Sequence, residues 1–212
     1  MKIEDVLKDE NVISLFKYGS HVYGTNNEHS DNDLIMVVIN GTTLSDEFLK
    51  NFNQFGDLTI YDESEFQNQI NNHEISVLEC LFLDKKDIYK NNKDWNFNLN
   101  LQTLRSSISG KASNSWVKAK KKFIVEKDYN PYIGQKSAWH ALRILNFGTQ
   151  IATFGKINNY QELTPLYKDI LSLDWEGINN KYKSLYNELA SKFREVAPKE
   201  ITMENKLKAN KP

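Results

Sequence analysis

The chain lacks several features that would define its class at once. Its one cysteine, Cys80, cannot form an internal disulfide, and four prolines with nine glycines exclude a collagen-like or linker-rich chain. Its longest apolar run, residues 34–39, has the length of a strand, whereas a membrane helix needs about 18 apolar residues. Acids at Glu4 and Asp5 stand where a signal peptide would be apolar. We therefore expect no membrane partner and a cytoplasmic location.

An excess of charge is also absent. The chain has 27 Lys and Arg against 28 Asp and Glu, a net charge of -1. Proteins that coat nucleic acids without specificity usually carry a clear basic excess, so that class is disfavoured. Two local basic stretches remain, at residues 118–122 and at Lys206, Lys208 and Lys211. Both are typical of solvated surface, although the first leaves contact with RNA open.

The chain is 40% hydrophobic and 12% aromatic, enough for a buried core. The spacing of apolar residues along the chain changes near its middle. This predicts an α+β fold, with a small mixed β-sheet core followed by an α-helical C-terminal region. We expect a domain over 1–92, a helical domain over 93–200 and a flexible tail over 201–212.

Short apolar runs and turn residues define the expected elements. In the first half we expect strands over 13–18, 34–39 and 57–61, a helix over 46–55, and a helix capped by Ser64 that runs to about residue 70. Residues 75–83 fit either a helix or a strand. In the second half we expect helices over 131–155 and 178–193, with a helix cap at Thr164 before Pro165.

The most informative pair of residues is Asp31 and Asp33. They stand two apart at the start of a strand, so both carboxylates project from one face. Adjacent carboxylates repel each other unless a cation lies between them, and hard oxygen ligands suit Mg²⁺ together with substrate phosphates. Two such ions can activate an attacking oxygen and stabilise a leaving phosphate.

The residues upstream fit the same chemistry. Gly19 follows a strand and would let a phosphate approach the backbone, and Ser20 can donate its hydroxyl and begin a helix. An Asp-x-Asp alone arises by chance in many acidic loops. Here it follows a strand with Gly-Ser, then Tyr23-Gly24-Thr25, and Ser30 stands directly before it. These fixed offsets make the pattern specific.

This pattern resembles the signature of the polymerase-β-like nucleotidyltransferase superfamily. The Tyr23-Gly24-Thr25 variant, residues 57–82 and residues 136–143 are similar to one branch, the predicted nucleotidyltransferases of the RNA-repair-pathway polymerase-β family. The resemblance extends from about residue 13 to about residue 200. It implies a site with two Mg²⁺ ions, Mn²⁺ as a substitute, and a nucleoside triphosphate such as ATP.

The superfamily uses a third carboxylate on a neighbouring strand. Asp57 is the first choice, because it opens a strand in the right order, and Asp62 on the opposite face of that strand is the competitor. Asp57 as a mere turn residue after Gly56 is the third possibility. Glu79, between leucines, would be costly to bury without a partner. A base such as Arg143 or the metal could supply that partner, so Glu79 stays outside the catalytic set.

Lys136, His140 and Arg143 stand at i, i+4 and i+7 and line one stripe of a helix. The resemblance implies that Lys136 and Arg143 bind the triphosphate and that His140 contacts phosphate or ribose. The alternative is a solvated basic face with an incidental histidine. His21, inside the Gly-Ser turn, is best explained as a surface loop residue.

Other enzyme classes fit less well. An Asp-x-Asp glycosyltransferase would carry a longer nucleotide-sugar domain before the motif, and a P-loop, zinc spacing and a nucleophile elbow are all missing. A sensor that binds a nucleotide or an RNA end in the same pocket is the alternative of a different class.

The resulting prediction is an Mg²⁺-dependent nucleotidyltransferase that moves an NMP from an NTP to an acceptor hydroxyl and releases pyrophosphate. Asp31, Asp33 and Asp57 would be catalytic and hold the metal, and Gly19 and Ser20 would bind phosphates. The acceptor is an RNA end, as in RNA repair, or otherwise a protein or a small molecule. Base preference and oligomeric state are left open.

Overall fold

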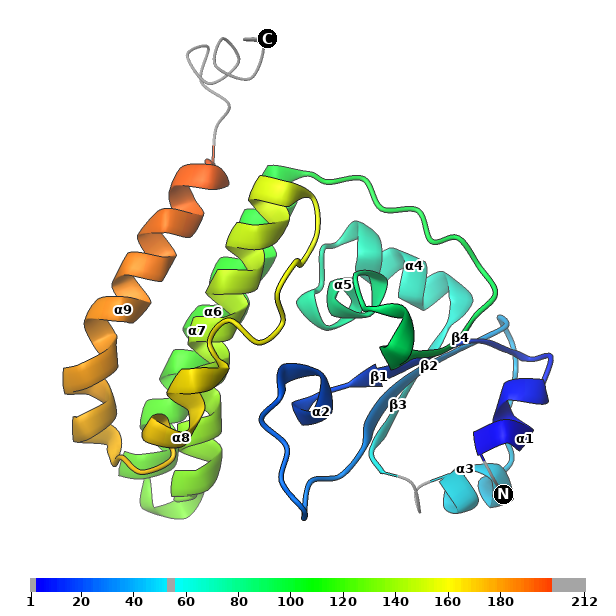
Figure 1. The fold of residues 1–212 in the computed structure, drawn as a ribbon, viewed down its shortest axis with the longest axis horizontal. Coiled ribbons are helices and arrows are strands. Elements are labelled where there is room, and N and C mark those ends of the chain that lie inside the picture. Colours follow the sequence, from blue (N-terminus) through cyan, green and yellow to red (C-terminus); the bar gives the residue numbers. More distant parts are fainter. Residues whose placement is uncertain (1–2, 53–55, 200–212) are drawn as a thin grey trace, which may run out of the picture. The chain divides into compact units, whose positions relative to one another are not determined.

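A computed structural model describes residues 3–52 and 56–199 (Figure 1). The chain forms two compact units: Met1–Asn98 with Ile157–Pro165, and Leu99–Lys156 with Leu166–Pro212. The boundary expected from the sequence stands between residues 92 and 93. Residues 93–98 belong to the first unit, and the segment Ile157–Pro165 returns to it from the helical half. The expected tail, 201–212, lies outside the described residues.

The first unit is built on a mixed four-stranded sheet in the order β3-β2-β1-β4. Its strands are β1 (Val12–Tyr18), β2 (Asp33–Val38), β3 (Leu58–Asp62) and β4 (Ile88–Asn91). β1 is antiparallel to β2 and β4, and β3 is parallel to β2. The expected α+β class with a small mixed sheet is confirmed, and the three expected strands lie within a residue of their predicted bounds.

Short helices connect these strands. They are α1 (Ile3–Lys8), α2 (Ser20–Tyr23), α3 (Asp46–Phe52), α4 (Glu63–Asn71) and α5 (Ile75–Leu81), followed by a 3-10 turn at Lys85–Asp87. Residues 75–81 are therefore helical. The expected cap at Ser64 is wrong, because the Asp62 carboxylate accepts the Glu65 backbone N–H at 2.8 Å and begins α4. An aspartate that ends a strand has the extended backbone that an N-cap requires.

Both faces of β2 are buried, which explains its continuous apolar run. On one face Leu34 and Met36 join a core with residues of α1 and α3, including Val6 and Phe52. On the other face Phe16 of β1 stacks on Phe66 of α4, with ring centres 5.9 Å apart. Strands covered on two sides lose the polar alternation of a half-exposed sheet. The central strands are thus packed on both sides, and the loops at the sheet's edges extend from them.

The second unit is helical. Its α-helices are α6 (Leu101–Ile124), α7 (Pro131–Phe154), α8 (Tyr167–Ile170) and α9 (Trp175–Val196). Asn100, Asn130 and Asp174 cap three of them through side-chain oxygens, and Pro131 takes the first helical position of α7. Thr164-Pro165 opens a 3-10 turn, Thr164–Leu166, rather than capping a long helix. No helix among the described residues is long and apolar enough to cross a membrane.

Candidate active site

The end of β1 and the start of β2 lie side by side at one edge of the sheet. Tyr18 is the partner of Asp33 in the antiparallel register, and Gly19 follows directly. Gly19 has φ 75° and ψ -149°, a backbone conformation that is open essentially to glycine alone. A Cβ atom at Gly19 would lie 1.8 Å from Oδ2 of Asp33. The predicted phosphate-binding glycine and the predicted metal ligand are therefore in direct contact.

Ser20 begins the single turn α2, as the sequence predicted. The backbone N–H groups of Val22 and Tyr23 donate to the Gly19 carbonyl at 3.0 and 3.2 Å. The turn ends at Gly24 in the left-handed conformation, with φ 67°. The Gly-Ser segment is thus folded into a compact turn directly after β1, with the Ser20 side chain partly exposed.

A second turn fixes the chain just before Asp31. The Ser30 hydroxyl accepts the Asn27 backbone N–H at 2.8 Å, and the Ser30 N–H donates to the Asn27 carbonyl at 3.1 Å. His21 Nε2 lies 3.4 Å from the Ser30 carbonyl, within reach of a hydrogen bond when that nitrogen carries the proton. Ser30 therefore shapes the approach to the Asp-x-Asp, and His21 connects the two turns. Asp31 is exposed and Asp33 is half-buried.

Asp57 comes to the same edge of the sheet as Asp33. β3 runs parallel to β2 with Leu34 opposite Leu58, and the Leu34 N–H donates to the Asp57 carbonyl at 2.8 Å. Asp33 and Asp57 therefore each stand one residue before a matched pair, on the same side of the sheet. Gly56, with φ 145°, permits this approach, because a Cβ there would lie 1.8 Å from the Asn32 carbonyl oxygen. The Asp57 side chain is exposed.

Asp62, the competing third carboxylate, lies at the opposite end of β3. It pairs with Val38 at the last residue of β2, and its carboxylate caps α4. It stands five positions along the chain from Asp57, which at about 3.3 Å per residue is roughly 16 Å. The register thus brings Asp57, and not Asp62, to the edge that holds Gly19 and Asp33.

The three carboxylates offer only hard oxygen donors, which is the chemistry that Mg²⁺ prefers. Within residues 3–52 and 56–199, no three His, Cys, Asp or Glu side chains converge closely enough to enclose an ion. Mg²⁺ is usually held by one or two carboxylates with substrate phosphates and water, so this donor set fits it when a nucleotide supplies the remaining oxygens.

Hydrogen bonds between α2, Glu79 and the returning segment hold the Gly-Ser turn in place. The Tyr23 hydroxyl donates to the buried Glu79 carboxylate, which is 1% exposed. From the returning segment, the Tyr160 hydroxyl donates to the Glu79 carbonyl at 2.6 Å and the Thr164 hydroxyl to the Tyr23 carbonyl at 2.5 Å. Sequence reasoning identified Glu79 as needing a partner but missed Tyr23, Tyr160 and Thr164. Nothing in the local pattern of residues 157–165 indicates that they return to this unit.

Lys136, His140 and Arg143 lie on α7 in the helical unit. Arg143 is 4% exposed, and its guanidinium carbon lies 4.9 Å from the centre of the Phe147 ring and 5.6 Å from that of Trp139. Its Nη2 donates to Nδ1 of His140 at 3.1 Å. The three residues therefore do not form the fully solvated basic face that was the alternative, because Arg143 is buried among aromatic rings.

The charge around His140 is strongly positive. Burial, followed by the nearby Arg143, Lys136 and Lys118 cations, lowers the pKa of His140 well below its usual value. The ring is therefore neutral near pH 7, and a bond accepted at Nδ1 leaves its proton on Nε2. Lys118 comes from α6, so the structure joins one residue of the basic stretch 118–122 to this group. Sequence spacing within α7 could not reveal that neighbour.

The first unit is similar to a known family of domains. Residues 1–95 match the family model described as a nucleotidyltransferase domain. Among solved structures, the chain is similar to spectinomycin adenyltransferase from Enterococcus faecialis, determined with ATP and spectinomycin. The two share 14% identity with a TM-score of 0.42, over 91% of this chain and 96% of that one. No curated protein sequence matches the chain. Residues 1–95 of the chain are thus similar to a nucleotidyltransferase domain, and the chain is a transferase.

Proposed function

We propose that the protein transfers an NMP from an NTP to an acceptor hydroxyl, with divalent metal ions held at Asp31, Asp33 and Asp57. The single observation that carries this proposal is the contact between Gly19 and the Asp33 carboxylate, at the edge that Asp57 also reaches. A turn that binds phosphate and carboxylates that hold metal can serve one reaction only when they are adjacent. The Gly-Ser turn and the Asp33 carboxylate are adjacent.

The Gly-Ser turn would bind the β- and γ-phosphates. Gly19 has no side chain, so a phosphate can approach its backbone next to Asp33 without displacing that carboxylate. The Ser20 hydroxyl is partly exposed and can donate to a phosphate oxygen. The network from Glu79 through Tyr23 supports this turn from behind, so Glu79 is a positioning residue and not a catalytic one.

Asp31 and Asp33 would hold both ions, and Asp57 would complete the ion on the side of the attacking hydroxyl. Bound Mg²⁺, or Mn²⁺ in its place, would neutralise charge on the phosphates and favour ionisation of the acceptor. Asp57 would orient the acceptor hydroxyl and take its proton. Its exposed carboxylate is accessible to an incoming acceptor.

In the reaction, the acceptor oxygen bonds to the α-phosphorus, and the bond from that phosphorus to the oxygen bridging to the β-phosphate breaks. Pyrophosphate leaves with the electron pair, and the acceptor proton passes to Asp57. Catalysis of this kind depends mainly on positioning and charge neutralisation. Lys136 would bind the triphosphate, and Arg143, which is 4% exposed and donates to Nδ1 of His140, would hold that ring in place. His140 is assigned to a phosphate or ribose contact, which as a neutral ring it would make as a donor from Nε2.

The acceptor decides the biological role, and an RNA end, a protein hydroxyl and a small molecule are the three candidates. The experiment supplies α-labelled ATP, GTP, CTP and UTP with Mg²⁺ to purified protein and a cell extract, and separates RNA, protein and small molecules. We expect label in one fraction with wild-type protein and none with Asp31→Asn. Retained nucleotide binding with no label sensitive to that substitution in any fraction would contradict transfer and favour a sensor of nucleotides or RNA ends.

A further inference from the structure

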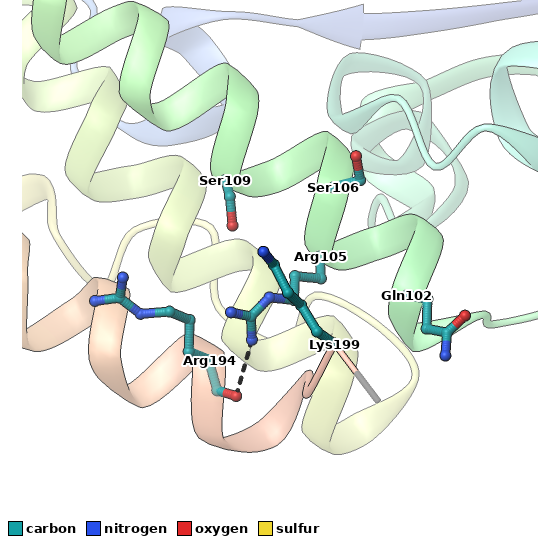
Figure 2. Close-up of a pocket in the computed structure, with 6 residues that line it drawn as sticks. All are labelled: Gln102, Arg105, Ser106, Ser109, Arg194 and Lys199. Carbon is teal, nitrogen blue, oxygen red and sulfur yellow. Dashed lines mark hydrogen bonds between the residues drawn. The ribbon is translucent and has the colours of Figure 1, made fainter. Parts of the chain in front are cut away.

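A pocket in the helical unit is not used by the proposed reaction (Figure 2). It has a volume of about 430 Å³, within the usual range for sites of small ligands. It lies where α6 begins and α9 ends, and its lining residues are Gln102, Arg105, Ser106, Ser109, Arg194 and Lys199.

The lining is made of positive charges and hydrogen-bond donors. Arg105, Arg194 and Lys199 bring three cations, and the other three residues bring two hydroxyls and an amide. Among the described residues that line the pocket there is neither a carboxylate nor an aromatic ring. Such a lining recognises an anion by charge and hydrogen bonds and offers no surface on which a nucleobase would stack.

One of the cations is held in place by the fold itself. Arg105 Nη1 donates to the Arg194 carbonyl at 3.2 Å and to the Ala197 carbonyl at 2.8 Å, and Figure 2 shows the first of these bonds as a dashed line. These carbonyls belong to the end of α9, where backbone acceptors lack helical partners. Both of these hydrogen bonds are donated by Nη1 of Arg105. The guanidinium is therefore fixed at the pocket before any ligand arrives.

The spacing along α6 places the donors on one face. Gln102, Ser106 and Ser109 follow each other at i, i+4 and i+7, and α9 supplies Arg194 across from them. Arg194 and Lys199 are exposed, so their charges cost little to keep in the folded protein. Three like charges around one cavity repel each other, and a bound anion with several oxygens would remove that repulsion.

We propose that this pocket binds phosphate groups, delivered either by a small polyphosphate or by the backbone of a polynucleotide. Arginine forks and hydroxyl donors match phosphate oxygens. The volume admits more than one phosphate group. The inference does not rest on nucleotidyl transfer, because the pocket contains none of the residues assigned to that reaction.

The test uses the full chain and the double variant Arg194→Gln with Lys199→Gln. Both side chains are exposed, and Arg105 stays in place to hold the end of α9. The matched control is Lys127→Gln with Lys192→Gln, which removes two exposed charges outside the pocket. Calorimetry in EDTA measures binding of tripolyphosphate, and anisotropy at several salt concentrations measures binding of a labelled single-stranded RNA 12-mer.

We expect the pocket variant to bind tripolyphosphate at least about tenfold more weakly than the control variant does. A weakening seen only with tripolyphosphate identifies a small polyphosphate as the source. If the RNA backbone is the source, the pocket variant also binds RNA with a weaker salt dependence. The slope of log K for RNA against log salt becomes less steep by roughly 0.7 for each lost phosphate contact. Equal affinities of the pocket and control variants for both probes, or no binding of either probe to wild type, would overturn the proposal.

Discussion

Gly19 lies so close to Asp33 that a Cβ atom there would be 1.8 Å from the aspartate Oδ2. Gly19→Ala should therefore displace the Asp33 carboxylate and strain a backbone with φ 75°. We expect kcat/KM for nucleotidyl transfer to fall at least about 100-fold, the effect of a small misplacement at a reacting centre.

Gly41→Ala is the matched control for that substitution. Gly41 has φ 79°, close to that of Gly19, but nothing lies within 4 Å of an added Cβ. It should cost about 1–2 kcal/mol of stability and leave the transfer rate unchanged. Equal activity of the two variants, measured as pyrophosphate release, would show that contact with Asp33 does not matter.

Asp57 stands directly before β3 and Asp62 is its last residue, so their substitutions should have different effects. Asp57→Ala should lower the transfer rate about 1000-fold, as loss of a metal-binding carboxylate would, and leave unfolding unchanged. Asp62→Ala should leave the rate unchanged and cost about 1 kcal/mol, because it removes the cap of α4. Rate assays measure transfer by both variants, and urea unfolding measures their free energies of unfolding. The reverse pattern would assign the third carboxylate to Asp62.

The hydroxyl of Tyr23 is expected to stabilise the first unit through Glu79. Tyr23→Phe removes a donor from a carboxylate that is 1% exposed. The loss should be about 1–3 kcal/mol, which lowers Tm by roughly 2–4 °C per kcal/mol in a chain of this size. Tyr89→Phe is the control, because the Tyr89 ring is 38% exposed. Equal melting temperatures of the two variants would contradict the role given to Glu79.

Stability should fall as the pH falls below about 6.5, the ordinary pKa of histidine. Burial and the nearby cations lower the pKa of folded His140, so below pH 6.5 the unfolded chain binds a proton that the folded chain does not. From this residue, the free energy of unfolding changes by at most about 1.4 kcal/mol per pH unit. His73 contributes in the same direction, because burial lowers its pKa too.

Urea unfolding between pH 8 and pH 5 measures this dependence. His140→Gln should reduce the slope, whereas His29→Gln should not, because the His29 side chain is 86% exposed. An unchanged slope in His140→Gln would mean that His140 is already protonated in the folded protein at neutral pH.

Local patterns predicted most of the sheet and brought the candidate site residues to its turns. Strands β1 to β3 carry apolar runs that end in turn residues, and Gly19, Asp31 and Asp33 stand at fixed distances from those strands. The choice between Asp57 and Asp62 needed the parallel register of β2 and β3, which pairs residues far apart in the chain. Sequence alone gives no such register, so it could not show which of the two aspartates lies at the edge with Asp33.

The parts that could not be predicted depend on long-range contacts. β4 is short and half polar, and it is a strand because it pairs with β1. Residues 157–165 return to the first unit through the hydroxyls of Tyr160 and Thr164, which bond backbone carbonyls near the site. Arg143 was expected on a basic stripe. It is buried because aromatic residues flank its guanidinium, a contact that helical spacing does not reveal.

The most direct test of the central claim is the number of metal ions bound beside the nucleotide. Mn²⁺ can be counted by its paramagnetic resonance in the presence of a non-hydrolysable ATP analogue. We predict two ions per wild-type chain that depend on the analogue, with the number reduced in Asp33→Asn and unchanged in Asp62→Asn, which keeps a side chain able to cap α4. Equal numbers in wild type and Asp33→Asn would contradict the assignment of the metal site to the edge where Gly19 contacts Asp33.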